Sequence, residues 1–199
     1  MKDKHNLPKA HERIKAIKAK IEDTAIRSTI NRFQYRYRMA RAFEGIVAPD
    51  IGKNTVEGYA VGMRLLLAYG AFDEIRLVRN SLPNIKPAKG SYVKIENKKL
   101  AEKLRKITEL KHLLSLSTAV KNPSLQKDVE NFFNERNNDV MCIATGLRNS
   151  YAHGVFTAAG AGLKTKTKRS YIDELAITIL DMTDEIANQC VNEYEKANQ

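Results

Sequence analysis

From Lys9 to Glu44 the chain contains no proline and no glycine, and its apolar residues recur at steps of three and four. That spacing places them on one face of an α-helix, whereas a half-buried strand requires strict alternation. The repeat consists of Ile14, Ile17, Ile21 and Ala25, followed by Ile30, Phe33, Tyr37 and Ala40. The pattern shifts near Asp23 and Thr24, so it predicts either one long bent helix or two joined helices.

The same periodicity recurs in later segments, near 55–81, 97–120 and 124–151, and from Ser170 towards the end of the sequence. Ser124 and Ser170 are the expected N-caps of the last two. Only residues 91–96 could be extended. The sequence therefore predicts an all-α antiparallel helical bundle of four to six helices, forming a single domain over 1–199.

The charge of the chain favours polyanionic partners. Lys and Arg total 34 against 23 Asp and Glu, which gives a formal net charge of +11 and a pI near 9.6. Residues 1–48 alone carry 12 basic and 5 acidic groups. An excess of this size is typical of nucleic-acid-binding proteins, although basic proteins without such partners are also common.

The sequence lacks the motifs of several enzyme classes, since it contains no Walker loop, dinucleotide fingerprint, HExxH or CxxC. Cys142 and Cys190 form no disulfide framework, and the four histidines are too sparse to nominate a metal site. We expect no metal and no cofactor. The N-terminus has no apolar signal region, and the longest uncharged stretch, 149–163, is too short to span a bilayer. We therefore expect a cytoplasmic protein without a membrane partner.

One segment combines side chains that suit chemistry on phosphates. Arg148, Asn149 and His153 lie where an apolar helix meets a loop rich in glycine and alanine, and Gly154 favours a helix end at this point. On a continuous helix Asn149 and His153 share a face, whereas Arg148 and His153 diverge by roughly 140°. The three side chains converge only if the helix unwinds before His153 or if a second copy of the chain contributes.

The run Arg148-Asn149-x-x-x-His153 resembles the signature of the HEPN superfamily, in which Arg is followed after four to six residues by His, often with Asn directly after the Arg. The family fold is a small all-α bundle with this motif late in the chain. The resemblance covers most of 50–199, and leaves residues 1–48 as a basic helical extension or an extra helix of the same bundle. In HEPN toxins that pair with nucleotidyltransferase antitoxins, a tyrosine typically stands two residues after the histidine. Val155 occupies that position here, which argues against regulation through such a tyrosine.

The resemblance implies metal-independent cleavage of RNA by a homodimer with a composite site, in a toxin or phage-defence setting with an antitoxin or regulatory partner. His153 would serve as the acid–base group, Arg148 would stabilise charge on the phosphate, and Asn149 would orient the phosphate or His153. Ser150 and Tyr151 are candidate substrate contacts. The alternative is a non-catalytic HEPN-like module that binds RNA or a protein partner. A third interpretation is a purely structural helical protein in which Arg148 and His153 only cap the helix.

Two basic segments are further candidates for RNA contact. The first follows the motif and is expected to hold the RNA backbone; its members are Lys164, Lys166, Lys168 and Arg169. The second mixes cations with aromatic residues, as single-stranded RNA sites do, and comprises Arg32, Phe33, Tyr35, Arg36, Tyr37, Arg38 and Arg41. Phe33 and Tyr37 lie on the apolar stripe, so the pattern also fits a helix whose arginines simply face solvent.

Overall fold

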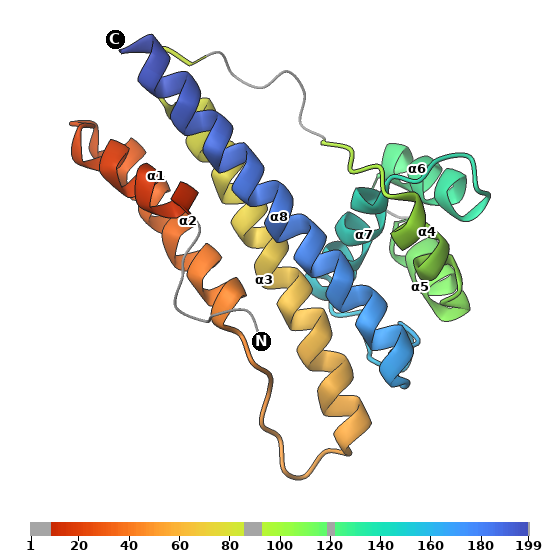
Figure 1. Ribbon diagram of the computed structural model, residues 1–199. Helices are drawn as coiled ribbons and strands as arrows, with labels where there is room; N and C mark the ends of the chain where they lie inside the picture. The colour runs from red at the N-terminus through yellow and green to blue at the C-terminus, as the bar shows by residue number, and fades with distance from the viewer. Residues whose placement is uncertain (1–8, 86–92, 119–121, 199) are drawn as a thin grey trace. The chain divides into compact units, whose positions relative to one another are not determined.

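The computed structural model describes residues 9–85, 93–118 and 122–198, and within these residues the protein is all-helical. The predicted fold class is confirmed at this level. The described residues form eight helices and one isolated antiparallel bridge, between Glu96 and Asp139 (Figure 1). The helices are α1 Lys9–Ala19, α2 Thr24–Ala42, α3 Lys53–Ser81, α4 Lys98–Arg105, α5 Thr108–Thr118, α6 Pro123–Phe133, α7 Val140–Ala152 and α8 Lys166–Ala197.

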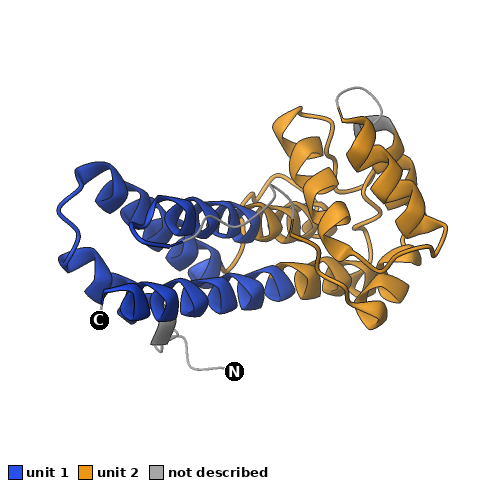
Figure 2. Cartoon of the chain, turned by 90° about the horizontal axis from the view of Figure 1, so that it is seen from above, with its two compact units in different colours: residues 1–43, 67–91, 177–199 blue, residues 44–66, 92–176 orange. Residues whose placement is uncertain are grey.

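The chain forms two compact units, each assembled from separate stretches of sequence (Figure 2). Unit 1 comprises Met1–Phe43, Leu67–Ser91 and Ile177–Gln199, and unit 2 comprises Glu44–Leu66 and Tyr92–Ala176. Helices α3 and α8 each contribute residues to both units. Neither unit coincides with the segments 1–48 and 50–199 distinguished in the sequence.

In unit 1, the long N-terminal pattern forms two helices instead of one. The side chain of Asp23 accepts hydrogen bonds from the backbone N–H groups of Ala25 and Ile26 at 2.7 and 3.2 Å, and so caps α2. The predicted stripe of α2 is buried, with Ile30, Phe33, Tyr37 and Ala40 all in the core. The phase shift near Asp23 therefore marks the turn between α1 and α2.

Polar side chains on the edges of that stripe also hold unit 1 together. The carboxylate of Glu74, which is buried, accepts from Arg36 at 3.1 Å and from Arg32 at 3.4 Å. The hydroxyl of Tyr37 donates to Asp184 at 2.6 Å, and Arg41 pairs with the same carboxylate. Charge-assisted hydrogen bonds of this kind are roughly twice as strong as neutral ones. Three of the arginines in the second basic candidate segment thus bind acidic groups of unit 1 itself.

In unit 2, two segments that were each predicted as one helix are divided. The segment 97–120 breaks after Arg105. The N–H groups of Lys106 and Ile107 donate to the carbonyl oxygens of Lys103 and Leu104, three residues earlier, and α5 begins at Thr108. Arg105 is the last residue of α4, and its guanidinium donates to the carbonyl oxygens of Phe132 and Asn137. The apolar stripe stays in phase across the turn, which is why periodicity alone did not detect it.

The segment 124–151 is divided between α6 and α7. Asn122, and not Ser124, caps α6, since its side chain accepts from the N–H of Leu125 at 3.1 Å. Asp139 is buried and caps α7 by accepting from Met141 N–H, and it also accepts from Ile95 N–H at 2.9 Å. The predicted cap of the last helix is also wrong. α8 begins at Lys166, and the hydroxyl of Thr165 accepts from Lys168 N–H.

Candidate nuclease site at the end of α7

The Arg148–His153 segment forms the last turn of α7 and its C-cap. His153 is the cap residue, and its N–H donates to the carbonyl oxygen of Asn149 at 3.0 Å. Gly154 follows with φ +68° and donates to Tyr151, while Val155 donates to Ser150. These two bonds, with a left-handed glycine after the cap, define a Schellman motif. Gly154 thus ends the helix, as its place in the sequence predicted.

The three residues of the motif lie near one another but do not form a cluster within one chain. Arg148 is exposed and donates from Nη1 to the side-chain oxygen of Asn149 at 3.0 Å. His153 is also exposed. Because the helical turn is intact up to the N–H of His153, Arg148 and His153 diverge by roughly 140° around the axis. Unwinding before His153, the first of the two conditions for convergence, does not occur in this structure.

Ser150 and Tyr151, the candidate substrate contacts, point into unit 2. The buried hydroxyl of Ser150 donates to the carbonyl oxygen of Gly146 at 2.8 Å. The Tyr151 ring stacks on Phe156 with centroids 3.9 Å apart, and its hydroxyl donates to the carbonyl oxygen of Tyr59 at 3.2 Å. Burial raises the pKa of Tyr151 above its ordinary value. Tyr151 therefore fixes the end of α7 against its surroundings, whereas Ser150 bonds back to the backbone of α7 itself.

A pair of glycines in α3 allows this close packing, and sequence reasoning missed it. A Cβ on Gly62 would overlap the Tyr151 hydroxyl, and a Cβ on Gly58 would lie 2.6 Å from the Cβ of Ala158. The two glycines are one helical turn apart, so they share a face. Phe156, Ala158, Ala161 and Leu163 are buried, which makes the segment after the motif a packed part of unit 2.

The basic run after this loop is divided between surface and interior. Arg169 is 7% exposed, pairs with Glu57, and donates to the carbonyl oxygens of Leu163 and Lys164 at 3.1 and 2.9 Å. Lys168 donates to both carboxylate oxygens of Glu109 at 2.8 Å, which lowers the pKa of that carboxyl. Lys164 and Lys166 are exposed. Of the four predicted RNA contacts, Lys168 and Arg169 thus bind carboxylates of unit 2, whereas Lys164 and Lys166 lie at its surface.

Comparison of the chain with family models, with curated proteins and with solved structures gives no match. In the part of the chain that the structure describes, no group of three or more His, Cys, Asp and Glu side chains is arranged to hold a metal ion. None of the helices among those residues combines the length and the apolar character needed to cross a bilayer.

Proposed function

We propose that this protein is a metal-independent endoribonuclease of the HEPN type, active as a homodimer whose site combines residues of both copies. The observation that carries the proposal is the placement of Arg148, Asn149 and His153. All three lie on the closing turn of one helix, with the arginine and histidine exposed and the arginine bonded to the asparagine. The net charge of +11 supports a polyanionic substrate.

The residue types suit cleavage of RNA through its own 2′-hydroxyl. His153 accepts the proton of that hydroxyl, and the 2′-oxygen forms a bond to phosphorus. The bond from phosphorus to the 5′-oxygen breaks, and the 5′-oxygen takes a proton from water. Arg148 stabilises the negative charge that grows on the phosphoryl oxygens. The products are a 2′,3′-cyclic phosphate and a 5′-hydroxyl.

The angle between the two exposed side chains supports the proposal of a homodimer. Arg148 and His153 of one chain diverge around α7, so a phosphate held by one arginine is best reached by the histidine of a second copy. A two-fold axis beside the end of α7 would bring each arginine towards the histidine of the partner. The same angle also favours the second candidate function, in which the segment binds RNA or a protein without cleaving it.

Cleavage of a mixed RNA pool in EDTA tests the enzyme activity. We expect cleavage that survives chelation, leaves cyclic phosphate ends, and falls by at least about 100-fold in His153→Ala. His112→Ala is the matched control, since His112 is also exposed. Arg148→Ala is compared in the same way with Arg136→Ala, because Arg136 is exposed as well. Loss of activity on chelation would contradict the proposal.

Mixing two inactive variants tests the composite site. Arg148→Ala and His153→Ala chains are each inactive, but a heterodimer joins the intact arginine of one to the intact histidine of the other. We expect activity to return when the variants are mixed and allowed to exchange subunits. If the native protein cleaves RNA but the mixture does not, the site lies within one chain. If the native protein binds RNA without cleaving it, the non-catalytic function is correct.

A further inference from the structure

Helices α1 and α2 of unit 1 carry a dense positive charge that the site at α7 does not use. Residues 9–42 contain ten Lys and Arg against three Asp and Glu. Arg13, Arg32, Arg36 and Arg41 pair with acidic side chains of unit 1. In the described residues, no ion pair joins Lys15, Lys18 or Arg27 to a carboxylate. These three cations are therefore open to a ligand from outside.

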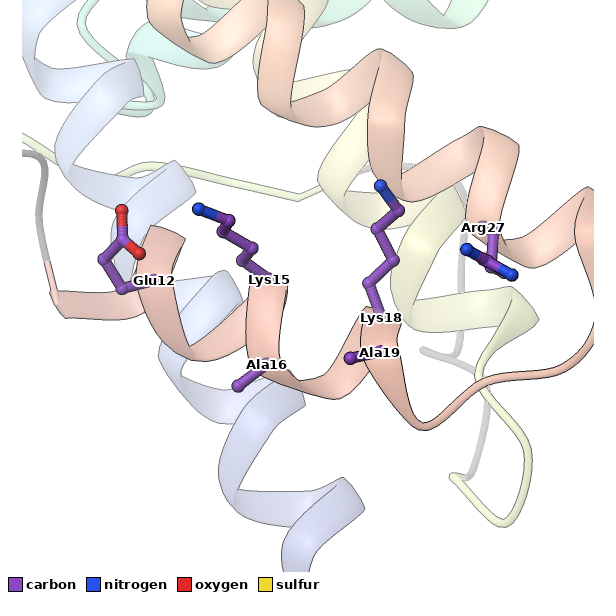
Figure 3. Close-up of a pocket in the computed structure, with 6 residues that line it drawn as sticks. All are labelled: Glu12, Lys15, Ala16, Lys18, Ala19 and Arg27. Atoms are coloured by element: carbon purple, nitrogen blue, oxygen red, sulfur yellow. The ribbon is translucent and has the colours of Figure 1, made fainter.

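The three cations meet around a hollow between α1 and α2. The hollow has a volume of about 470 Å³, and its lining consists of Glu12, Lys15, Ala16, Lys18, Ala19 and Arg27. Figure 3 shows Lys15 and Lys18 projecting on the same side of α1, with Arg27 on α2 beyond Lys18. Three cations thus face one carboxylate, that of Glu12, which lies 3.5 Å from Nδ1 of His11. This balance suits a ligand with several negative charges.

An exposed aromatic ring continues the surface along α2. A second hollow shares Lys18 and Arg27 with the first and extends to Asn31. Tyr35 follows Asn31 by one helical turn, so it lies on the same face. Its side chain is 64% exposed, and the Arg38 guanidinium lies over the ring, 5.1 Å from the centroid. Neither Phe33 nor Tyr37 takes part, since both are buried.

We infer that this surface, the α1–α2 basic face formed by Lys15, Lys18, Arg27, Tyr35 and Arg38, binds single-stranded RNA. The lysines and Arg27 contact consecutive phosphates, and an unpaired base stacks on Tyr35 beside the Arg38 guanidinium. Aromatic rings and cations along one face are the combination by which proteins hold single strands. The inference names a substrate-holding surface for the proposed nuclease, but it comes from unit 1 and does not depend on cleavage at α7.

A membrane surface is the main competing ligand, because basic helices also bind anionic lipids. A helix that lies in a bilayer interface presents a broad apolar face to the lipid. The apolar face of α2 is instead buried in unit 1, through Ile30, Phe33, Tyr37 and Ala40. The exposed side of α2 is mainly cationic, and its large apolar side chains are those of Tyr35 and Met39. That composition favours RNA over lipid.

Binding of a labelled single-stranded RNA to the full chain tests this inference, with His153→Ala as the background so that the RNA stays intact. The variant Lys15→Ala/Lys18→Ala/Arg27→Ala should bind more weakly, and the slope of log K against log[salt], which is negative, should become shallower by about 2. Lys98→Ala/Lys99→Ala/Lys127→Ala removes the same charge from exposed positions of unit 2 and should leave the slope almost unchanged. Circular dichroism confirms that each variant is folded.

The role of the ring is tested separately. Tyr35→Ala should weaken binding of the single strand about 5- to 150-fold, whereas Tyr35→Phe, which keeps the ring, should bind normally. A duplex of the same sequence should be insensitive to both changes.

The inference is wrong if the triple variant behaves like its unit 2 control, or if Tyr35→Ala binds as the native chain does. It is also wrong if the variants lose binding only to phosphatidylserine vesicles. This test measures binding only. Its result therefore does not depend on whether the protein cleaves RNA, and the cleavage assay does not depend on whether RNA binds at the α1–α2 basic face.

Discussion

The phenol of Tyr151 fills the space that Gly62 leaves open by having no side chain. A Cβ at position 62 would overlap the hydroxyl oxygen and lie 2.7 Å from Cε2 of the ring. The ring cannot easily move, because it stacks on Phe156 and its hydroxyl bonds to the carbonyl oxygen of Tyr59. The end of α7, and with it the Arg148–His153 turn, is therefore held in place by a glycine far away in the sequence.

Gly62→Ala should destabilise the protein by about 1–3 kcal/mol, since the added methyl group forces the packed ring to shift. Gly70→Ala is the matched control in the same helix. There the nearest atoms to an added Cβ are 3.7 Å away, so alanine should add about 0.4–1 kcal/mol of stability. Urea denaturation measures both. Equal stability of the two variants would contradict the packing described for Tyr151.

Arg169→Ala should cost about 1–3 kcal/mol of stability, because it leaves the carbonyl oxygens of Leu163 and Lys164 and the carboxylate of Glu57 without their donor. Lys166→Ala, at an exposed position in the same run, should change stability by less than about 0.5 kcal/mol. Thermal denaturation compares the two. If they are equally stable, Arg169 contributes no more to the fold than a surface lysine does.

Asp139→Ala should cost more than Asn122→Ala, although both residues cap a helix. Asn122 accepts one backbone N–H, so its loss should cost about 1 kcal/mol. Asp139 is buried and accepts from both Ile95 and Met141, so its removal leaves two buried donors unsatisfied. We expect a loss of about 2–4 kcal/mol, measured by urea denaturation. A loss no larger than that of Asn122→Ala would show that the bond to Ile95 adds nothing.

The stability of the protein should fall as the pH is lowered from 7.5 to 5.5, through the buried ring of His11. The ring stacks on Tyr37, with Glu12 near Nδ1 and the cations Arg38 and Lys15 facing it. Burial, opposed by Glu12 and reinforced by the two cations, lowers the pKa of His11 below its usual value near 6.5. Below that pH the unfolded chain takes up a proton that the folded chain does not, so stability decreases. The loss is at most about 1.4 kcal/mol for each pH unit.

His11→Phe keeps the stacked ring but cannot bind a proton, so its stability should fall less over this range. His112→Gln is the control, because His112 is exposed and should leave the pH dependence as it is in the native chain. Urea denaturation at the two pH values gives the comparison. Identical pH profiles for the native chain and His11→Phe would rule out this role for His11.

Periodicity predicted a helix well where one apolar stripe packs in one phase, as in α2. It failed at the break between α4 and α5, because Leu104, Ile107 and Leu110 are all buried and keep the helical spacing through the turn. The break before α7 had a local signal, the polar residues that end in Asp139, which are typical of a helix cap. The local sequence thus predicted that a segment is helical better than it predicted where each helix begins and ends.

The candidate site divides in the same way. The end of α7 could be predicted, because Gly154 lies directly after the last turn, and a glycine in the left-handed conformation ends a helix through local backbone geometry alone. The burial of Arg169 could not, since its partner Glu57 lies 112 residues earlier in the chain. A run of Lys and Arg has the same appearance in the sequence whether its members face solvent or pair with carboxylates of distant segments, as Lys168 does with Glu109 and Arg169 with Glu57. Only the tertiary structure distinguishes the exposed Lys164 and Lys166 from Lys168 and Arg169, which pair with carboxylates.

The pairing of Arg13 with Asn192 and Glu195 has a consequence for how the protein is made. A ribosome synthesises about 5–20 residues per second, so roughly 10 to 35 s separate the emergence of these partners. During that interval α1 and α2 exist without the helix that completes unit 1, and the side chains of Ile30, Phe33 and Tyr37 remain partly uncovered. The growing chain therefore carries an apolar and strongly basic pair of segments for this whole interval, before the helix that pairs with Arg13 has been synthesised.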